Sequence, residues 1–182
     1  MEDKDNNLQA KLIKPKIFKL DKYFIPKVNF DEILVRVMYA GVCGTDIHSF
    51  LGENRFIKNY PIVLGHEFIG EIIKLGNKKS RFKIGDIVTS EPFYVCNKCE
   101  YCKRGDYNLC ENLVFMEGAF SYYVIVKEQM TYKIPKNIDL PHAVFIEPLS
   151  VALHAMKISK IREGQSILIF GILYVICSFT IT

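Results

Sequence analysis

Apolar residues along most of the chain occur in short runs separated by turn residues. Ile33, Val35 and Val37 alternate with less apolar neighbours, as in a strand that is buried mainly on one face. Three further apolar runs follow at residues 68–75, 87–89 and 119–126. Short strands bounded by turns are typical of antiparallel sheets. The pattern therefore predicts a compact, mostly antiparallel β-domain.

The character of the chain changes near residue 139. Asp139 is a good helix N-cap, and Pro141 is tolerated in a first helical turn, so a short helix is predicted here. Because Pro148 disfavours helical geometry in the residue before it, Glu147 is expected at a break. A second short helix is predicted after that break, over residues 149–157.

The last part of the sequence carries no charged residue. Residues 167–170 are all apolar, which is typical of a central parallel strand in an α/β unit. Residues 166–182 are fewer than the ~20 that a membrane-spanning helix needs. We therefore expect a strand followed by an atypical apolar tail, residues 172–182, and no membrane anchor.

Composition and charge narrow the possible partners. Hydrophobic residues make up 49% and charged residues 24% of the chain, which is ordinary for a globular protein. The net charge of +4 is spread in short groups with acids interleaved, so no nucleic-acid-binding face is expected. The first ten residues lack the apolar core of a secretory signal. Six cysteines in such a chain favour a reducing, cytoplasmic compartment.

Four cysteines form the clearest motif. Cys96, Cys99, Cys102 and Cys110 have the spacing C-x2-C-x2-C-x7-C. Four thiolates complete a tetrahedral Zn²⁺ at about 2.3 Å each and leave no position for water, so the site would be structural. An iron–sulfur cluster is the alternative, because ferredoxin motifs open with the same spacing. Those motifs place a proline after the fourth cysteine, and here Glu111 stands there, which favours zinc.

A second group of candidate ligands is scattered along the first half. Cys43 lies in a glycine-flanked turn after an expected strand, and His66 and Glu67 follow another short extended segment. One thiolate, one imidazole and one carboxylate suit a Zn²⁺ that keeps a position open for water or substrate. Taken alone, a His-Glu pair is more often a surface or core feature. The order of the motifs along the chain therefore carries more weight than any one of them.

Read in order, the motifs resemble those of the zinc-dependent medium-chain dehydrogenases, over about residues 30–171. The shared motifs are Cys43-x-Thr45-x-x-His48, Gly65-His66-Glu67-x-x-Gly70, Gly85-Asp86-x-Val88, the four-cysteine run and Glu147-Pro148. The stretch 146–155 is most similar to the sorbitol and threonine dehydrogenase branch, since ethanol-type relatives have a cysteine where Glu147 stands.

The resemblance implies a fold and a domain plan. Residues 29–138 would form a GroES-like catalytic domain, a partly open antiparallel barrel with a structural zinc lobe at 91–112. Residues 1–28 would carry the first strands, and residues 139–171 two short helices and the first strand of a Rossmann unit. Gly171 would be its first glycine, but no further glycine of a G-x-G-x-x-G turn follows. The expectation is a chain truncated before its nucleotide domain.

The resemblance also implies the metal ligands. Cys43 and His66 would bind the catalytic zinc, and either Glu67 or Glu147 would be the third direct ligand. Cys96, Cys99, Cys102 and Cys110 would hold a second, structural zinc.

Three residues of one turn would assist catalysis. Thr45 would hydrogen-bond the substrate hydroxyl, His48 would pass its proton to solvent, and Asp46 would orient the histidine ligand. The implied reaction is oxidation of a secondary alcohol or polyol, a small-molecule substrate, by hydride transfer to NAD or NADP. Full-length relatives would bind the nucleotide and form homo-oligomers, whereas this chain alone is expected to be inactive.

Two points stay open in the sequence. The alternative function is a non-catalytic zinc-binding module that binds no nucleotide. The connection between Cys110 and Gly118 is short for the family, and it borders the expected substrate cleft. The identity of the substrate is therefore undetermined.

Overall fold

The computed structural model describes residues 7–25, 27–57 and 59–168 of the 182-residue chain. Strands dominate this part of the protein and pair only in antiparallel fashion. The strands are β1 (Leu8–Lys14), β2 (Ile17–Lys22), β3 (Glu32–Ala40), β4 (Ile62–Val63), β5 (Phe68–Leu75), β6 (Ile87–Ser90), β7 (Phe93–Tyr94), β8 (Val114–Phe115), β9 (Tyr123–Lys127) and β10 (Thr131–Lys133).

A five-stranded sheet in the order β10-β6-β5-β3-β9 holds the main core. One face of this sheet buries branched and aromatic side chains from β3, β5, β6 and β9. The buried members of this cluster are Ile33, Val35, Phe68, Ile72, Phe82, Val88, Met116, Ala119, Val124 and Val126. β3 pairs with both β5 and β9, so it is an interior strand of this sheet.

A three-stranded sheet, β2-β1-β4, is joined to the first sheet by residues just before β9. Ala10 N–H donates to Phe120 O (2.7 Å) and Tyr122 N–H donates to Leu8 O (2.9 Å). Tyr122 O in turn accepts from Val37 N–H of β3 (2.9 Å). The two sheets therefore curve toward each other without closing, and the expected mostly β, partly open architecture is confirmed.

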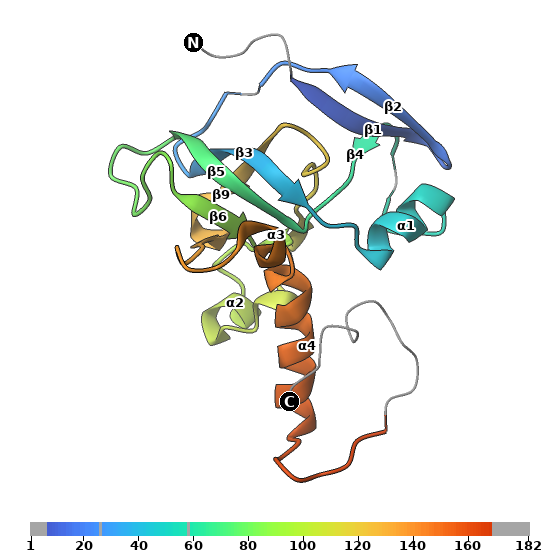
Figure 1. The fold of residues 1–182 in the computed structure, drawn as a ribbon, viewed down its shortest axis with the longest axis vertical. Coiled ribbons are helices and arrows are strands. Elements are labelled where there is room, and N and C mark those ends of the chain that lie inside the picture. The colour runs from blue at the N-terminus through green and yellow to red at the C-terminus, as the bar shows by residue number, and fades with distance from the viewer. Residues whose placement is uncertain (1–6, 26, 58, 169–182) are drawn as a thin grey trace.

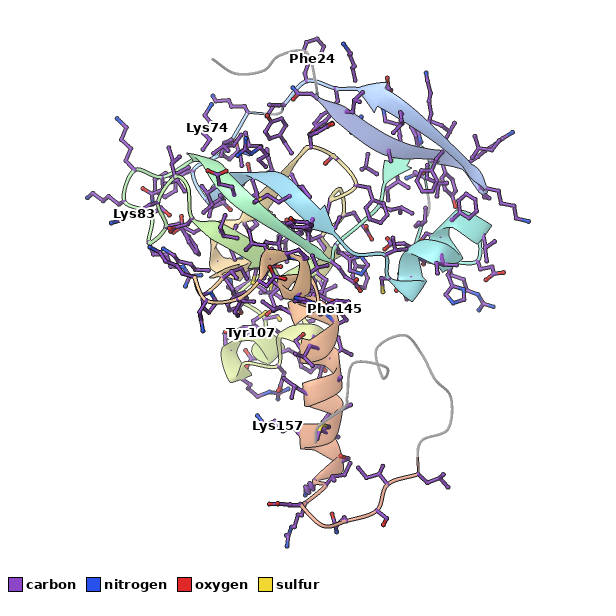
Figure 2. The ribbon with its side chains drawn as sticks, viewed as in Figure 1. Phe24, Lys74, Lys83, Tyr107, Phe145 and Lys157 are labelled. Carbon is purple, nitrogen blue, oxygen red and sulfur yellow. The ribbon has the colours of Figure 1, made fainter. Side chains whose placement is uncertain are left out.

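The helices lie around the sheets. They are α1 (Gly44–Leu51), α2 (Glu100–Arg104), α3 (Leu140–Ala143) and α4 (Ile146–Ser159), with 3₁₀ turns at Tyr107–Leu109 and Glu128–Met130. β1, β2 and α1 lie at one side of the molecule, while α4 runs away from the sheets (Figure 1). Along α4, Phe145 lies at the end nearest the sheets and Lys157 far from them, on the side opposite Phe24 (Figure 2).

The predicted break at Glu147 is wrong. Glu147 lies in the first turn of α4, and the break falls at residues 144–145 instead. Pro148 is tolerated because it is the third residue of the helix, where a backbone N–H has no partner within the helix anyway. The intrahelical bonds begin right after it, with Leu149 N–H donating to Phe145 O at 2.8 Å. The second helix is consequently longer than predicted.

Two strand predictions also need correction. Leu34 is only 4% exposed, so β3 is buried on both faces near its start and not mainly on one. Its second face is covered by N-terminal residues such as Tyr23, which lines a small cavity with Leu34. The run 119–126 becomes strand only from Tyr123, because residues 119 and 120 bond instead to the backbone carbonyls of Gly65 and Leu64.

The end of the chain is described only as far as residue 168. Ile167 and Leu168 are exposed and belong to no strand. The rest of the predicted Rossmann strand, Gly171 and the apolar tail 172–182 lie outside the described residues. Within residues 7–25, 27–57 and 59–168, no helix combines the length and apolarity needed to cross a membrane.

Candidate metal centres

Two neighbouring strands bring the scattered ligands together. Cys43 follows the end of β3 and caps α1, while His66 and Glu67 lie immediately before β5. The end of β3 pairs with the start of β5, Ala40 opposite Phe68, so both ligand segments leave the sheet at the same place. As a result, one ligand atom from each of Cys43, His66 and Glu67 lies within 4.8 Å of the others.

Asp46 ties the two ligand segments to each other. Its Oδ2 accepts a hydrogen bond from the backbone N–H of Cys43 (2.9 Å), and its Oδ1 accepts one from Gly65 (3.2 Å). The side chain is buried, and this burial raises the pKa of Asp46. Its Oδ1 lies 4.0 Å from Nδ1 of His66, which is longer than a hydrogen bond. Asp46 therefore contacts the segment that carries His66 through the backbone.

Two glycines make room for this arrangement. Gly65 has a φ of +94°, and a Cβ there would lie 2.5 Å from the ring of Phe120. A Cβ on Gly41 would collide with the carboxylate of Glu67 and crowd Val144. The Cys43–His66–Glu67 cluster thus depends on backbone positions that accept no side chain.

A cavity of about 700 Å³ opens onto the cluster. Thr45 lines it, with Oγ1 lying 3.5 Å from Sγ of Cys43. Glu147 lines the same cavity, and burial raises its pKa, but its carboxylate lies outside the compact ligand set. Much of the remaining wall is apolar and includes Phe56, Ile57, Pro92, Phe115, Met116 and Val151.

His48 lies away from this cavity. Its side chain is 60% exposed, and its Nδ1 lies 2.8 Å from Oε2 of Glu53. The structure therefore separates the two residues expected to handle a proton: Thr45 faces the cavity and His48 faces solvent.

The electrostatics of the cluster favour a cation. Burial lowers the pKa of His66, but the neighbouring Cys43, Glu117 and Asp46 outweigh that effect and raise it to about 11. A histidine pKa rises in this way only where negative charge surrounds the ring. A divalent ion satisfies the same demand, and a thiolate, an imidazole and a carboxylate suit Zn²⁺. The side chains present therefore fit a zinc ion.

Sequence reasoning missed Glu117. Its Oε2 lies 3.8 Å from Nδ1 of His66, and this buried oxygen has no hydrogen-bond partner among the described residues. Glu117 reaches the site because Met116 and Ala119 are buried in the main core and fix the segment between them. The one available signal was the unusually short connection before Gly118.

The four cysteines lie together in a separate lobe below the sheet. One ligand atom from each of Cys96, Cys99, Cys102 and Cys110 lies within 4.8 Å of the others. Sγ of Cys99 lies 3.5 Å from Sγ of Cys102, and all four cysteines are free thiols. The strand pair β7–β8 closes the lobe at its base.

The backbone of the lobe stabilises thiolates unequally. Backbone N–H groups of Lys98 and Cys99 lower the pKa of Cys96 to about 6. Burial and neighbouring sulfurs raise the pKa of Cys102 to about 12. Crowding four sulfurs in this way is unfavourable for thiolates alone, and a Zn²⁺ ion among them removes the repulsion.

Comparison with known proteins gives consistent matches. Residues 29–136 match the alcohol dehydrogenase GroES-like domain. The chain is 39% identical over 162 residues to sorbitol dehydrogenase of Bacillus subtilis, covering 84% of this chain and 45% of that protein. It is 41% identical over 149 residues to D-xylulose reductase A of Aspergillus oryzae, covering 77% and 41%.

Solved structures agree. The fold matches the crystal structure of an oxidoreductase/dehydrogenase of unknown specificity from Escherichia coli with a TM-score of 0.80 and 35% identity, covering 87% of this chain and 48% of that one. Galactitol-1-phosphate dehydrogenase from Escherichia coli matches with a TM-score of 0.78 and 28% identity, covering 84% and 45%.

This chain spans less than half the length of the two curated relatives, 45% and 41%. The match nevertheless includes the whole run of motifs from Cys43 to the four-cysteine lobe. On these grounds the chain belongs to the zinc-dependent medium-chain alcohol dehydrogenase family and carries its N-terminal, GroES-like domain.

Proposed function

We propose that this chain forms the catalytic domain of a zinc- and NAD(P)-dependent dehydrogenase that oxidises a secondary hydroxyl group of a polyol. The observation that carries the proposal is the Cys43–His66–Glu67 cluster, whose ligand atoms lie within 4.8 Å at the wall of a cavity of about 700 Å³. The named activities of sorbitol dehydrogenase and D-xylulose reductase support the polyol class.

Cys43, His66 and Glu67 would hold the zinc, and Glu147, which lines the same cavity, would approach it or its bound water. Zinc supplies a Lewis acid that lowers the pKa of a bound hydroxyl group. Thr45 stands beside Cys43, where its hydroxyl can accept a hydrogen bond from the substrate hydroxyl. His48, exposed and paired with Glu53, would release that proton to water.

NAD or NADP is proposed as the hydride acceptor. Related crystal structures are described as bound to NADP, in a dehydrogenase from Sinorhizobium meliloti, and to NADH, in an alcohol dehydrogenase from E. coli. A second zinc ion is proposed for the lobe, where the four thiols leave no position for substrate. That ion would be structural, because the lobe contains few buried apolar residues of its own.

Cobalt substitution tests the proposal on this chain without any nucleotide. Tetrahedral Co²⁺ reports its ligands through visible absorption, and four thiolates give a different spectrum from one thiolate with an imidazole and a carboxylate. We expect two Co²⁺ ions per chain, and we expect xylitol or sorbitol to shift only the bands of the cavity ion.

Cys43→Ala is the control for this experiment. It should remove the cavity bands and the polyol response while the lobe bands persist. If Co²⁺ enters the lobe alone in the unaltered chain, the chain is a zinc-binding module and not a catalytic domain.

A further inference from the structure

Two carboxylates compete for one nitrogen of His66. Oδ1 of Asp46 lies 4.0 Å and Oε2 of Glu117 lies 3.8 Å from Nδ1 of the ring. Both distances exceed a hydrogen bond, and a small side-chain rotation would bring either carboxylate into contact with Nδ1. The partner of His66 is therefore the carboxylate whose oxygen is free to accept a hydrogen bond from Nδ1–H.

Asp46 is already engaged. Its Oδ2 accepts from the N–H of Cys43 at 2.9 Å, and its Oδ1 accepts from the N–H of Gly65 at 3.2 Å. Any rotation of this carboxylate toward His66 would weaken one of the two bonds that hold the ligand segments together. Asp46 is also nearly fully buried, so it has little room to move.

Glu117 is in the opposite situation. Its Oε2 is buried and has no hydrogen-bond partner within the described residues. Its side chain lines both the metal-site cavity and a second cavity of about 280 Å³, so space for rotation exists on two sides. A buried carboxylate oxygen without a donor is unfavourable, and the N–H of His66 is the donor within reach.

We propose that Glu117 accepts the Nδ1–H hydrogen bond of His66 and is the residue that positions this histidine for metal binding. Asp46 then has a different task, which is to hold the Cys43 and His66 segments together through their backbones. The inference rests on the proposed function, since it concerns the metal ligand His66.

The consequence for His66 is chemical. Neutral imidazole carries one proton, and a carboxylate beside Nδ1 keeps that proton there. Nε2 then presents its lone pair to the metal, and the hydrogen bond to Glu117 makes it a stronger ligand. Glu117 is thus a positioning residue, which acts on the metal through His66.

The test is a Co²⁺ titration of the full 182-residue chain. Glu117→Ala should weaken Co²⁺ binding in the cavity about 10- to 100-fold, the usual effect of losing the partner of a ligating histidine. Glu117→Gln should restore part of this loss, because its amide oxygen can still accept. Binding in the four-cysteine lobe of the same molecule should not change, which provides an internal measure that each variant is folded.

Two matched variants separate positioning from folding. Glu53→Gln makes the same change beside Nδ1 of His48, outside the cavity, and should leave both Co²⁺ affinities unchanged. Asp46→Asn should lower the unfolding temperature more than Glu117→Ala does, since it loses a backbone tie. In the Zn²⁺-loaded chain, the Nδ1–H proton of His66 should show the downfield NMR shift of a hydrogen bond to a carboxylate, and Glu117→Ala should abolish that shift.

Two results would overturn the inference, and they differ. Unchanged cavity affinity and an unchanged Nδ1–H shift of His66 in Glu117→Ala would remove the role of Glu117 and leave the proposed function standing. A cavity that binds no Co²⁺ in the unaltered chain would remove the proposed function and this inference together.

Discussion

The two metal centres of this chain are built in opposite ways. The lobe takes all its ligands from one short segment, residues 96–110, and surrounds the metal position with four sulfurs. The cavity centre takes Cys43 from one strand end and His66 with Glu67 from another, and it leaves one side open to the cavity. In this chain the ligands of the closed lobe are neighbours in sequence. The ligands of the open cavity centre are held in place by the sheet.

The largest effect is expected from breaking the lobe. Cys102→Ser removes a buried sulfur ligand, and structural zinc sites contribute about 10–16 kcal/mol of binding free energy in small zinc-dependent peptides. We expect the lobe to lose its metal and its backbone amides, residues 95–113, to exchange freely with solvent. Hydrogen exchange with zinc analysis measures both. The cavity centre should keep its ion, and loss of both ions would show that the two centres are not independent.

Gly65→Ala should break the cavity centre and spare the lobe. A side chain at φ +94° is strained and would collide with Phe120, so we expect a loss of about 2–4 kcal/mol and a displaced His66. Gly105→Ala is the matched control, because Gly105 has a φ of +85° but nothing within 4 Å of a new Cβ. It should cost only about 1–2 kcal/mol. Urea unfolding compares the variants, and equal losses would contradict a role for Phe120.

These two centres also show what the sequence could establish. The spacing of the four cysteines suffices for the lobe, because neighbours in sequence are neighbours in space. Cys43, His66 and Glu67 were recognisable only through the order of several motifs. Glu117 was not recognisable, because its approach to His66 depends on how the segment between two core residues crosses the sheet edge.

The fold shows the same division. The strands β5 and β6 follow from their apolar runs almost residue by residue. The burial of Leu34 does not follow from its apolar run, because residues of the N-terminal segment, distant in sequence, cover this side chain. The helical position of Glu147 also escaped prediction, since the preference of a residue before proline is weak beside the packing of a helix start.

The pH dependence should differ between the centres. Protons compete with zinc for its ligands, so affinity rises with pH while a ligand pKa lies above the pH. The pKa of His66 is raised to about 11 and the pKa of Cys102 to about 12. At neutral pH each of these groups should therefore lose a proton when zinc binds. Each such proton changes the affinity about tenfold per pH unit.

The pKa of Cys96 is lowered to about 6, so at neutral pH this thiol is already ionised and should lose hardly any proton when zinc binds. Below about pH 6, protons should compete with zinc for its sulfur. The lobe affinity should therefore fall more steeply there than above. Calorimetric zinc titrations in buffers of different ionisation enthalpy count the protons, with Cys43→Ala isolating the lobe. If the lobe affinity of that variant changed with pH equally steeply above and below pH 6, the lowered pKa of Cys96 would be contradicted.

The smallest effect is expected far from both centres. Lys127→Met removes ion pairs to Asp31 (2.8 Å) and Glu32 (3.1 Å), which are largely at the surface, so we expect a loss of about 0.2–1 kcal/mol. Lys127 lowers the pKa of Asp31, so this stabilisation is present above the unfolded-state pKa and is lost as pH falls through the lower folded value. Urea unfolding at neutral and acid pH checks this, and a change in metal content would contradict it.

The strand pair at the base of the lobe has a consequence for protein engineering. Phe93 faces Phe115 and Tyr94 faces Val114, so the two ends of the lobe leave the body of the protein side by side, about 5 Å apart. A two-residue Asn-Gly hairpin could replace residues 95–113 without moving either strand. The lobe is thus attached through one strand pair and through its packing against Met130, so a lobe transplanted onto another antiparallel pair would need a replacement for that apolar contact.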